Sequence, residues 1–318
     1  MYQFNPQEMK EKCVAWIREF FEKNGCSLKT ERGNRVFPVT DKAQSILDCL
    51  QTQLRRSGVT VRTARVKSIA TLDGAACGVR TQDGFFEAKK VILATGGASY
   101  PTTGSTGDGY AMAQNLGHTI VPAEGSLVPL ETAGTDCQDM QGLSLRNCAV
   151  KLLNAKGKVL YKDFGELLFT HFGVSGPTVL SASAHLKGEH CRLVIDLKPA
   201  LDEATLDARL LSDFSKYKNR DLINALGDLL PSKMIEPFVD MTGIPRDTKV
   251  HSITKEMRKK MIATFKAFRV PISGLRPIDE AIITRGGIPS DEIDPRTMQS
   301  KICEGLYFAG EIIDVDGY

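Results

Sequence analysis

Apolar residues recur with helical spacing in two stretches near the start of the chain, residues 5–25 and 41–56. Asn5 and Pro6 suit the first turn of one helix, and Asn24-Gly25 suits its end. Thr40 stands where the N-cap of the second helix is expected. The pattern therefore predicts two amphipathic helices, each with an apolar face that packs against another element.

A period-two alternation follows from residue 59 to residue 95, interrupted by Asp73-Gly74 and Asp83-Gly84. Asp-Gly pairs are typical of tight hairpin turns, so this stretch predicts a three-stranded antiparallel meander that leads into a last strand, 90–95. The run Val91-Ile92-Leu93 predicts a strand buried on both faces, as in a parallel sheet. A short helix is expected at 110–117.

The predicted secondary structure in the middle of the chain changes from strands to helices. Strand patterns fill residues 130–196, with a short helix after Ser175-Gly176-Pro177, and charged helical patterns fill 202–268. Pro231, Pro237 and Pro245 are expected to interrupt those helices. Strand-like segments return at 279–288 and 300–313. We therefore predict three parts: 1–131 and 277–318 form one α/β unit, and 132–276 is inserted into it.

Composition excludes several classes of protein. The 41 Lys and Arg residues nearly match the 38 Asp and Glu residues and are scattered, which argues against a nucleic-acid-binding arm. No apolar run approaches the ~20 residues that cross a bilayer, and no signal-peptide pattern opens the chain. The eight cysteines have no CxxC pair and no metal-ligand spacing. We expect a soluble cytoplasmic protein with no membrane, nucleic-acid or metal partner.

Glycines follow two predicted strands at the point where each ends. Thr95-Gly96-Gly97 comes after 91–93, and Gly310-Glu311 comes after 306–309. Glycine permits φ > 0 and close approach of a ligand to the backbone, and a carboxylate can accept hydrogen bonds from ligand hydroxyls. A tight turn without a ligand explains one glycine pair equally well. The recurrence of the pattern favours a ligand site.

Four motifs give a specific resemblance. The stretches VILATGGASYPTTGSTGDGYAMAQNLGH, FTHFGVSGPTVLS, ITRGGI and GLYFAGEIIDVDGY, in this order, resemble the bacterial aminoacetone-oxidase-like NAD(P)/FAD-dependent oxidoreductases, a family that includes bile-acid-reducing flavoenzymes. The resemblance implies an α/β fold: an FAD/NAD(P)-binding Rossmann-like domain, incomplete here, with an inserted β-barrel-like plus helical domain. It also implies FAD as the cofactor, NAD(P)H as the reductant and a small organic or steroid-like substrate. The cofactor-binding residues that it implies are Val66, Thr95, Gly96, Gly97, Gly310, Glu311, Asp314, Asp316 and Gly317.

The chain departs from this family pattern at both ends. It has no GxGxxG motif on a strand–helix unit, and it stops at Tyr318 where the family continues. We therefore expect a fragment of a longer flavoenzyme, inactive alone and binding FAD weakly. Within the longer protein, Gly96→Val is expected to impair FAD binding more than stability, because the side chain would project toward the cofactor.

Other candidate chemistry is weaker. The RVFP segment, with Arg35 and Phe37, resembles the family's stretch beside the substrate. His171 serves as an acid or base in one interpretation and as a structural residue in another, and Arg285 either meets an anionic group or forms a surface ion pair. The alternative to an oxidoreductase is a non-catalytic or RNA-related flavin-fold binding module. The sequence predicts no catalytic residue, substrate identity or oligomeric state.

Overall fold

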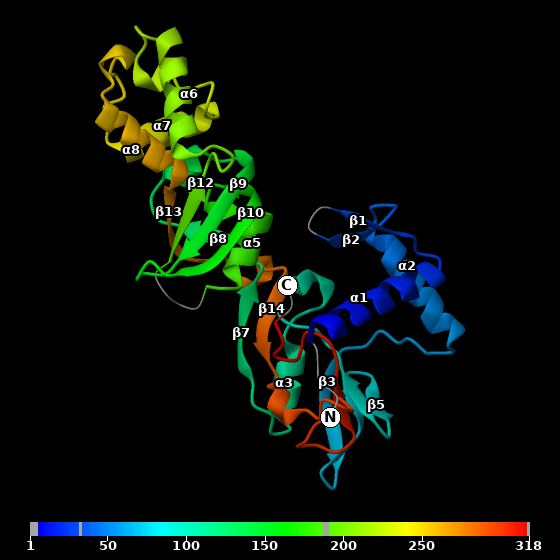
Figure 1. Ribbon diagram of the computed structural model, residues 1–318. Helices are drawn as coiled ribbons and strands as arrows, with labels where there is room; N and C mark the ends of the chain where they lie inside the picture. Colours follow the sequence, from blue (N-terminus) through cyan, green and yellow to red (C-terminus); the bar gives the residue numbers. More distant parts are fainter. Residues whose placement is uncertain (1–5, 32–33, 187–190, 317–318) are drawn as a thin grey trace. The chain divides into compact units, whose positions relative to one another are not determined.

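The structure is a computed structural model that describes residues 6–31, 34–186 and 191–316, without the side chains of 6–10. It divides into two compact units, residues 1–65 and 66–318, each of which is described by itself. The first unit comprises two helices and a two-stranded hairpin (Figure 1). Its elements are α1 (Pro6–Lys23), β1 (Leu28–Glu31), β2 (Arg35–Pro38) and α2 (Ala43–Arg56).

Both predicted helices of the first unit are present, but the second begins differently from the prediction. The N-cap of α2 is Lys42, with no side-chain cap bond. Thr40 is bonded instead to the hydroxyl of Ser45, at 2.6 Å between the two oxygens. The predicted cap Asn5 lies outside the described residues. Within α1, Trp16 keeps 67% of its surface exposed.

The second unit begins with the predicted three-stranded meander, which is confirmed except at its start: residues 59–65 form no strand, and the first strand begins at Val66. Strands β3 (Val66–Leu72), β4 (Ala75–Thr81) and β5 (Gly84–Glu87) pair antiparallel in the order β3-β4-β5. Strand β6 (Val91–Leu93) then pairs in parallel with β15 (Leu306–Phe308), from the far end of the chain. The expected burial on both faces is wrong for Ile92, which is 67% exposed, whereas Val91 and Leu93 are buried.

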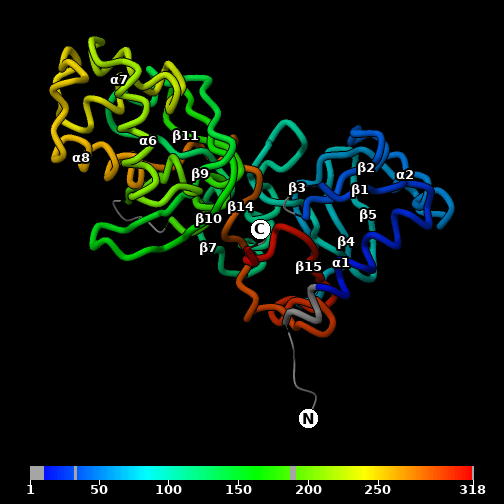
Figure 2. The backbone as a smooth tube through the Cα atoms, turned by 45° about the horizontal axis from the view of Figure 1, so that its top comes forward, coloured from blue at the N-terminus to red at the C-terminus, as the bar shows by residue number. Residues whose placement is uncertain are grey.

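A second two-stranded sheet lies next along the chain. After η1 (Pro101–Thr103) and α3 (Asp108–Gln114), β7 (Val121–Ser126) pairs antiparallel with β14 (Ile283–Gly287). The C-terminal segment runs beside β14, as the red end of the tube in Figure 2 shows, and Ile288 N donates to Ile312 O at 2.9 Å. Residues far apart in the sequence are thus joined near the ends of β6, β14 and β15.

Six strands between β7 and β14 close into a barrel in the order β10-β11-β8-β13-β12-β9. Closure leaves no unpaired strand edge. Helices α4 (Asp136–Asp139) and α5 (Pro177–Ser183) accompany these strands. The strands are β8 (Leu130–Thr132), β9 (Ser144–Leu153), β10 (Val159–Phe169), β11 (Gly173–Ser175), β12 (Arg192–Asp196) and β13 (Phe268–Leu275).

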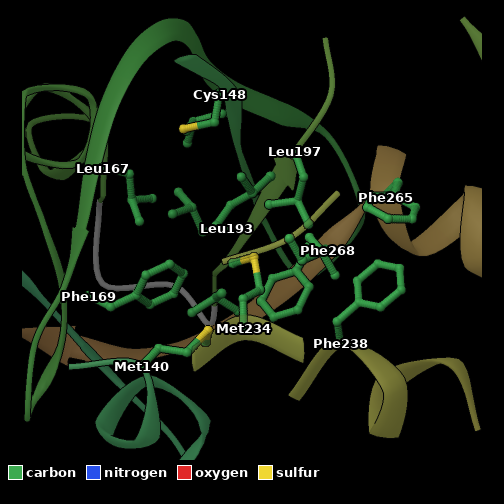
Figure 3. Packing of buried hydrophobic residues seen from close by; sticks show 14 of the residues in the cluster. Met140, Cys148, Leu167, Phe169, Leu193, Leu197, Met234, Phe238, Phe265 and Phe268 are labelled. Carbon is green, nitrogen blue, oxygen red and sulfur yellow. The ribbon is translucent and has the colours of Figure 1, made fainter. Parts of the chain in front are cut away.

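Three longer helices gather at one end of this barrel (Figure 1), and their side chains join its core (Figure 3). They are α6 (Glu203–Lys216), α7 (Ser232–Thr242) and α8 (Lys255–Lys266). Asp202 and Thr254 cap α6 and α8 by accepting bonds from Thr205 N and Met257 N. Pro237 does not interrupt the helical pattern as predicted, because it lies inside α7 with its ring buried.

The second unit has two hydrophobic clusters. One spans the barrel and its helices, from Leu130 to Ile272, and the other joins the meander, β6, α3 and the C-terminal segment. The insertion, with its boundaries at 131 and 276, stays a prediction. None of the described helices is long and apolar enough to span a bilayer.

Candidate functional site

Strands β6 and β15 end at the same edge of their parallel sheet. Leu93 pairs with Phe308, and Ala309 N donates to Leu93 O at 3.2 Å. The two glycine-bearing segments that the sequence singled out, 95–97 and 310–311, therefore leave the sheet side by side. The carboxyl end of parallel strands is where open α/β sheets bind ligands, which makes this edge the candidate site.

The carboxylate of Glu311 ties three chain segments together at this edge. Its Oε2 accepts from Gly97 N at 3.2 Å, and its Oε1 accepts from Thr284 N at 2.6 Å. The Thr284 hydroxyl oxygen in turn accepts from Ala98 N at 2.8 Å and from Ser99 N at 3.0 Å. Sequence reasoning expected Glu311 to bind ligand hydroxyls and did not single out Thr284. In the structure both carboxylate oxygens hold backbone amides.

The glycines after β6 make room for side chains of the chain itself. A Cβ on Gly97 would lie 2.2 Å from Thr284 Oγ1 and 2.5 Å from its Cβ. Gly96 has φ +74°, and a Cβ there would meet Ser105 Oγ at 2.9 Å. Within the chain, the nearest neighbour of a side chain at Gly96 is a serine hydroxyl, and its projection toward a cofactor stays a prediction.

Gly310 differs from both, because its surroundings are open. Its φ is +82°, and apart from its chain neighbours no heavy atom of the described residues lies within 4 Å of an added Cβ. Ile313 N donates to Gly310 O at 3.2 Å, which closes a turn. Within the described residues, the amides of Gly310, Glu311 and Ile312 donate to no acceptor. Successive free amides in such a turn form a concavity that binds anionic or hydroxyl oxygen.

Tyr110, on α3, contributes a second unsatisfied donor near this edge. Its hydroxyl is buried and has no hydrogen-bond partner among the described residues. Burial raises the pKa of the phenol, and the negative charges of Glu311 and Asp314 raise it further. Buried polar atoms in native proteins nearly always have a hydrogen-bond partner. A ligand oxygen would supply the partner that the Tyr110 hydroxyl lacks.

The remaining predicted residues are scattered. Val66 opens β3, Asp314 N donates to Ile288 O at 2.8 Å, and Asp316 is exposed. Gly317 lies outside the described residues. Arg35 and Phe37 lie on β2 of the first unit, where the guanidinium lies over the Phe37 ring. The role of these residues in cofactor binding stays a prediction.

Arg285 and His171 both have contacts within the chain. Arg285 pairs with Glu124 of β7, and its guanidinium also reaches Ala184 O at 3.4 Å. Arg285 therefore forms an ion pair, as one of the two interpretations expected. The pair is not fully at the surface, because it joins two strands and only 17% of the Arg285 side chain is exposed. His171 is exposed at the turn between β10 and β11, edge-on to Phe172.

A buried histidine fixes the segment that precedes β15. The side chain of His118 is fully buried, with Nδ1 2.7 Å from Glu292 Oε2 and Nε2 2.8 Å from Ser300 Oγ. Its ring packs edge-on against Phe308 of β15. Glu292 also accepts from Thr119 N at 3.1 Å. The cluster thus connects the end of α3 to the strand that delivers Gly310.

This cluster predicts a dependence of stability on acid. Burial alone would raise the pKa of Glu292, but the bonds from Thr119 and His118 outweigh it, so the pKa is lowered on folding. The resulting stabilisation is present above the unfolded pKa, about 4.3, and is lost as the pH falls through the folded value. Urea unfolding of Glu292→Gln and wild type at pH 7 and pH 3 is expected to show a smaller pH-dependent loss in the variant. An equal loss in both proteins would contradict this assignment.

Comparisons with known proteins find several relatives of this chain. The chain is 28% identical over 304 residues to the 3-dehydro-bile acid delta(4,6)-reductase of Clostridium scindens, covering 94% of this chain and 74% of that protein. It is 31% identical over 289 residues to the ribosomal RNA dihydrouridine synthase of Escherichia coli, covering 87% and 68%. The synthase of the same name from Haemophilus influenzae is 29% identical over 282 residues, with the same two shares.

A solved structure, Aquifex aeolicus GidA, aligns with 93% of this chain and 49% of that one at 11% identity. Its TM-score of 0.36 is too low to support a common fold. The fold class rests instead on the strand topology and on a match to a family model. Residues 4–318 match the HI0933-like protein Rossmann domain, so the chain belongs to the HI0933-like Rossmann family.

Proposed function

We propose that the protein is an FAD-dependent oxidoreductase that takes hydride from NAD(P)H and reduces a small organic or steroid-like substrate. The observation that carries this proposal is the open turn at Gly310, with three amides that have no acceptor among the described residues, at the carboxyl end of two parallel strands. The family match and the names of the curated relatives support it. One of these relatives is named a reductase and the other a dihydrouridine synthase, and reduction of a carbon–carbon double bond is a reaction suited to hydride transfer from a reduced flavin.

The residues at the strand ends fit an FAD. The amides of Gly310, Glu311 and Ile312 would hold a phosphate or hydroxyl oxygen, and the Tyr110 hydroxyl would donate to another. Glu311 would act as a positioning residue, because its carboxylate already holds Gly97 and Thr284. A bound flavin supplies the hydride chemistry. The chain itself supplies the backbone donors that would hold it.

Reduction of uridine in an RNA is a second candidate. The 31% identity to the Escherichia coli synthase favours it, and uracil carries the same conjugated double bond. The nearly balanced charge of the chain favours a small substrate over RNA. Anaerobic oxidation of reduced enzyme by a steroid dienone or by uridine-containing RNA, with product mass as the readout, would separate the two. If the protein were a non-catalytic module, neither the steroid dienone nor the RNA would oxidise its reduced flavin.

Gly310→Ala is expected to weaken FAD binding about tenfold or more, because a methyl group would enter the space above the free amides. Gly134→Ala is the matched control: its φ is +83°, its surroundings are equally open, and it lies beyond the candidate site, between β8 and α4. Both variants are expected to lose a similar ~1–2 kcal/mol of stability from backbone strain. Flavin fluorescence titration and urea unfolding measure the two effects. FAD affinity equal to that of wild type in Gly310→Ala would overturn the proposed site.

A further inference from the structure

A pocket of about 260 Å³ lies on the barrel, apart from the strand ends described above. It lies between the start of β9, the end of β12 and the segment that leads into α7. Its apolar lining includes Leu197 and Met234, which belong to the barrel core and are labelled in Figure 3. Its polar lining includes Arg146, Asn147 and Lys198. Cavities of roughly this size and mixture bind small ligands.

Lys198 contributes a primary amine to the lining of this pocket. Its side chain is half-buried, and its amine has no ion pair with a carboxylate among the described residues. Burial lowers the pKa of this amine, and the positive charge of Arg209 lowers it further. Lysines that are desolvated beside another cation are the ones that act as nucleophiles near neutral pH.

The charged groups around Lys198 leave the pocket cationic. Asp196, two residues earlier, is paired through Oδ2 with Lys266 of α8 at 2.8 Å. Arg209 of α6 is paired with the buried Asp213 at 2.7 Å. Arg146 of β9 lines the pocket and has no carboxylate partner among the described side chains. Burial raises the pKa of the nearby Cys148 thiol to about 11, so the thiol does not compete as a nucleophile.

We infer that Lys198 forms an imine with a small aldehyde or ketone that carries a carboxylate, and that Arg146 binds the carboxylate. In this step the amine lone pair adds to the carbonyl carbon, and the carbonyl oxygen leaves as water after two proton transfers. No oxidant or reductant is required. The inference does not depend on the proposed flavin site, because the pocket belongs to a different hydrophobic cluster.

The test uses glyoxylate as the anionic probe and propanal as the neutral probe, each with cyanoborohydride to reduce the imine to a stable secondary amine. Peptide mapping after short exposure at pH 7 is expected to find Lys198 labelled several-fold faster than the exposed Lys151 and Lys162, since the lowered pKa leaves more of its amine uncharged. The rate at Lys198 is expected to level off below the pH at which a free lysine amine titrates. Lys198→Arg should remove this fast phase.

Arg146→Gln separates the two parts of the inference. It is expected to slow labelling of Lys198 by glyoxylate several-fold while leaving labelling by propanal unchanged, because only glyoxylate carries a carboxylate. Lys162→Arg is the matched control and should change neither rate. Glyoxylate labelling spread evenly over exposed lysines would overturn the inference. An equal effect of Arg146→Gln on both probes would overturn the carboxylate contact.

Discussion

Gly97→Val is expected to lower the free energy of unfolding by roughly 3 kcal/mol, since overpacking is costly and two hydrogen bonds are lost with it. A Cβ at this position would lie 2.2 Å from Thr284 Oγ1 and 3.1 Å from Glu311 Cδ. Thr284 would have to move, and its hydroxyl would no longer accept from Ala98 and Ser99. FAD affinity is expected to fall together with stability. Urea unfolding and flavin titration on the same preparation measure both.

Gly227→Val is the control for this substitution. No heavy atom lies within 4 Å of a Cβ at Gly227, and its φ lies outside the left-handed region. A loss of stability confined to Gly97→Val would confirm the close approach at the strand end. Equal losses in the two variants would show that the effect belongs to valine in place of glycine and not to the contact with Thr284.

Glu311→Ala is expected to cost about 2–5 kcal/mol of stability, because it leaves the amides of Gly97 and Thr284 without their acceptor in a partly buried place. Glu311→Gln should cost less, since its single amide oxygen can still accept from one of them. The free energy of unfolding is expected to be lowest for Glu311→Ala, higher for Glu311→Gln and highest for wild type. Loss of the carboxylate should also loosen the link between 95–99 and β14.

Glu304→Gln and Glu304→Ala serve as controls, because this side chain is exposed and lies just before β15. Both are expected to lie within about 0.5 kcal/mol of wild type. If Glu311→Ala unfolded like Glu304→Ala, the carboxylate would not organise the strand ends. Its role would then have to be sought in direct contact with a ligand.

The fold could be predicted where local patterns determine it. Period-two alternation with Asp-Gly turns gave the meander, and helical spacing gave α1 and α2. The closed barrel could not be predicted from the residues alone, because β8 and β11 have three residues each and their pairing partners are distant in sequence. Ile92 shows the same limit: an apolar run indicates a strand but does not say which face another layer covers.

The part of the candidate site that depends on local sequence could also be predicted. The glycines after β6 and β15 were found because glycine is the residue that readily adopts a positive φ, so its place in the sequence indicates a turn. Thr284 was missed because its role depends on the contact between β14 and the loop after β6, which no local pattern contains. Tyr110 was missed for a similar reason: only its burial without a partner distinguishes it from a core tyrosine.

The barrel leaves and rejoins the rest of its unit through adjacent strands. Leu130 of β8 pairs with Leu275 of β13, and Arg276 N donates to Pro129 O at 3.0 Å. The chain thus departs and returns at almost the same point, after an excursion of more than a hundred residues. Evolution can lengthen, exchange or remodel such an excursion without altering the register of β6 against β15. Descendants of one ancestor can in this way exchange the barrel and its pockets while inheriting unchanged strand ends.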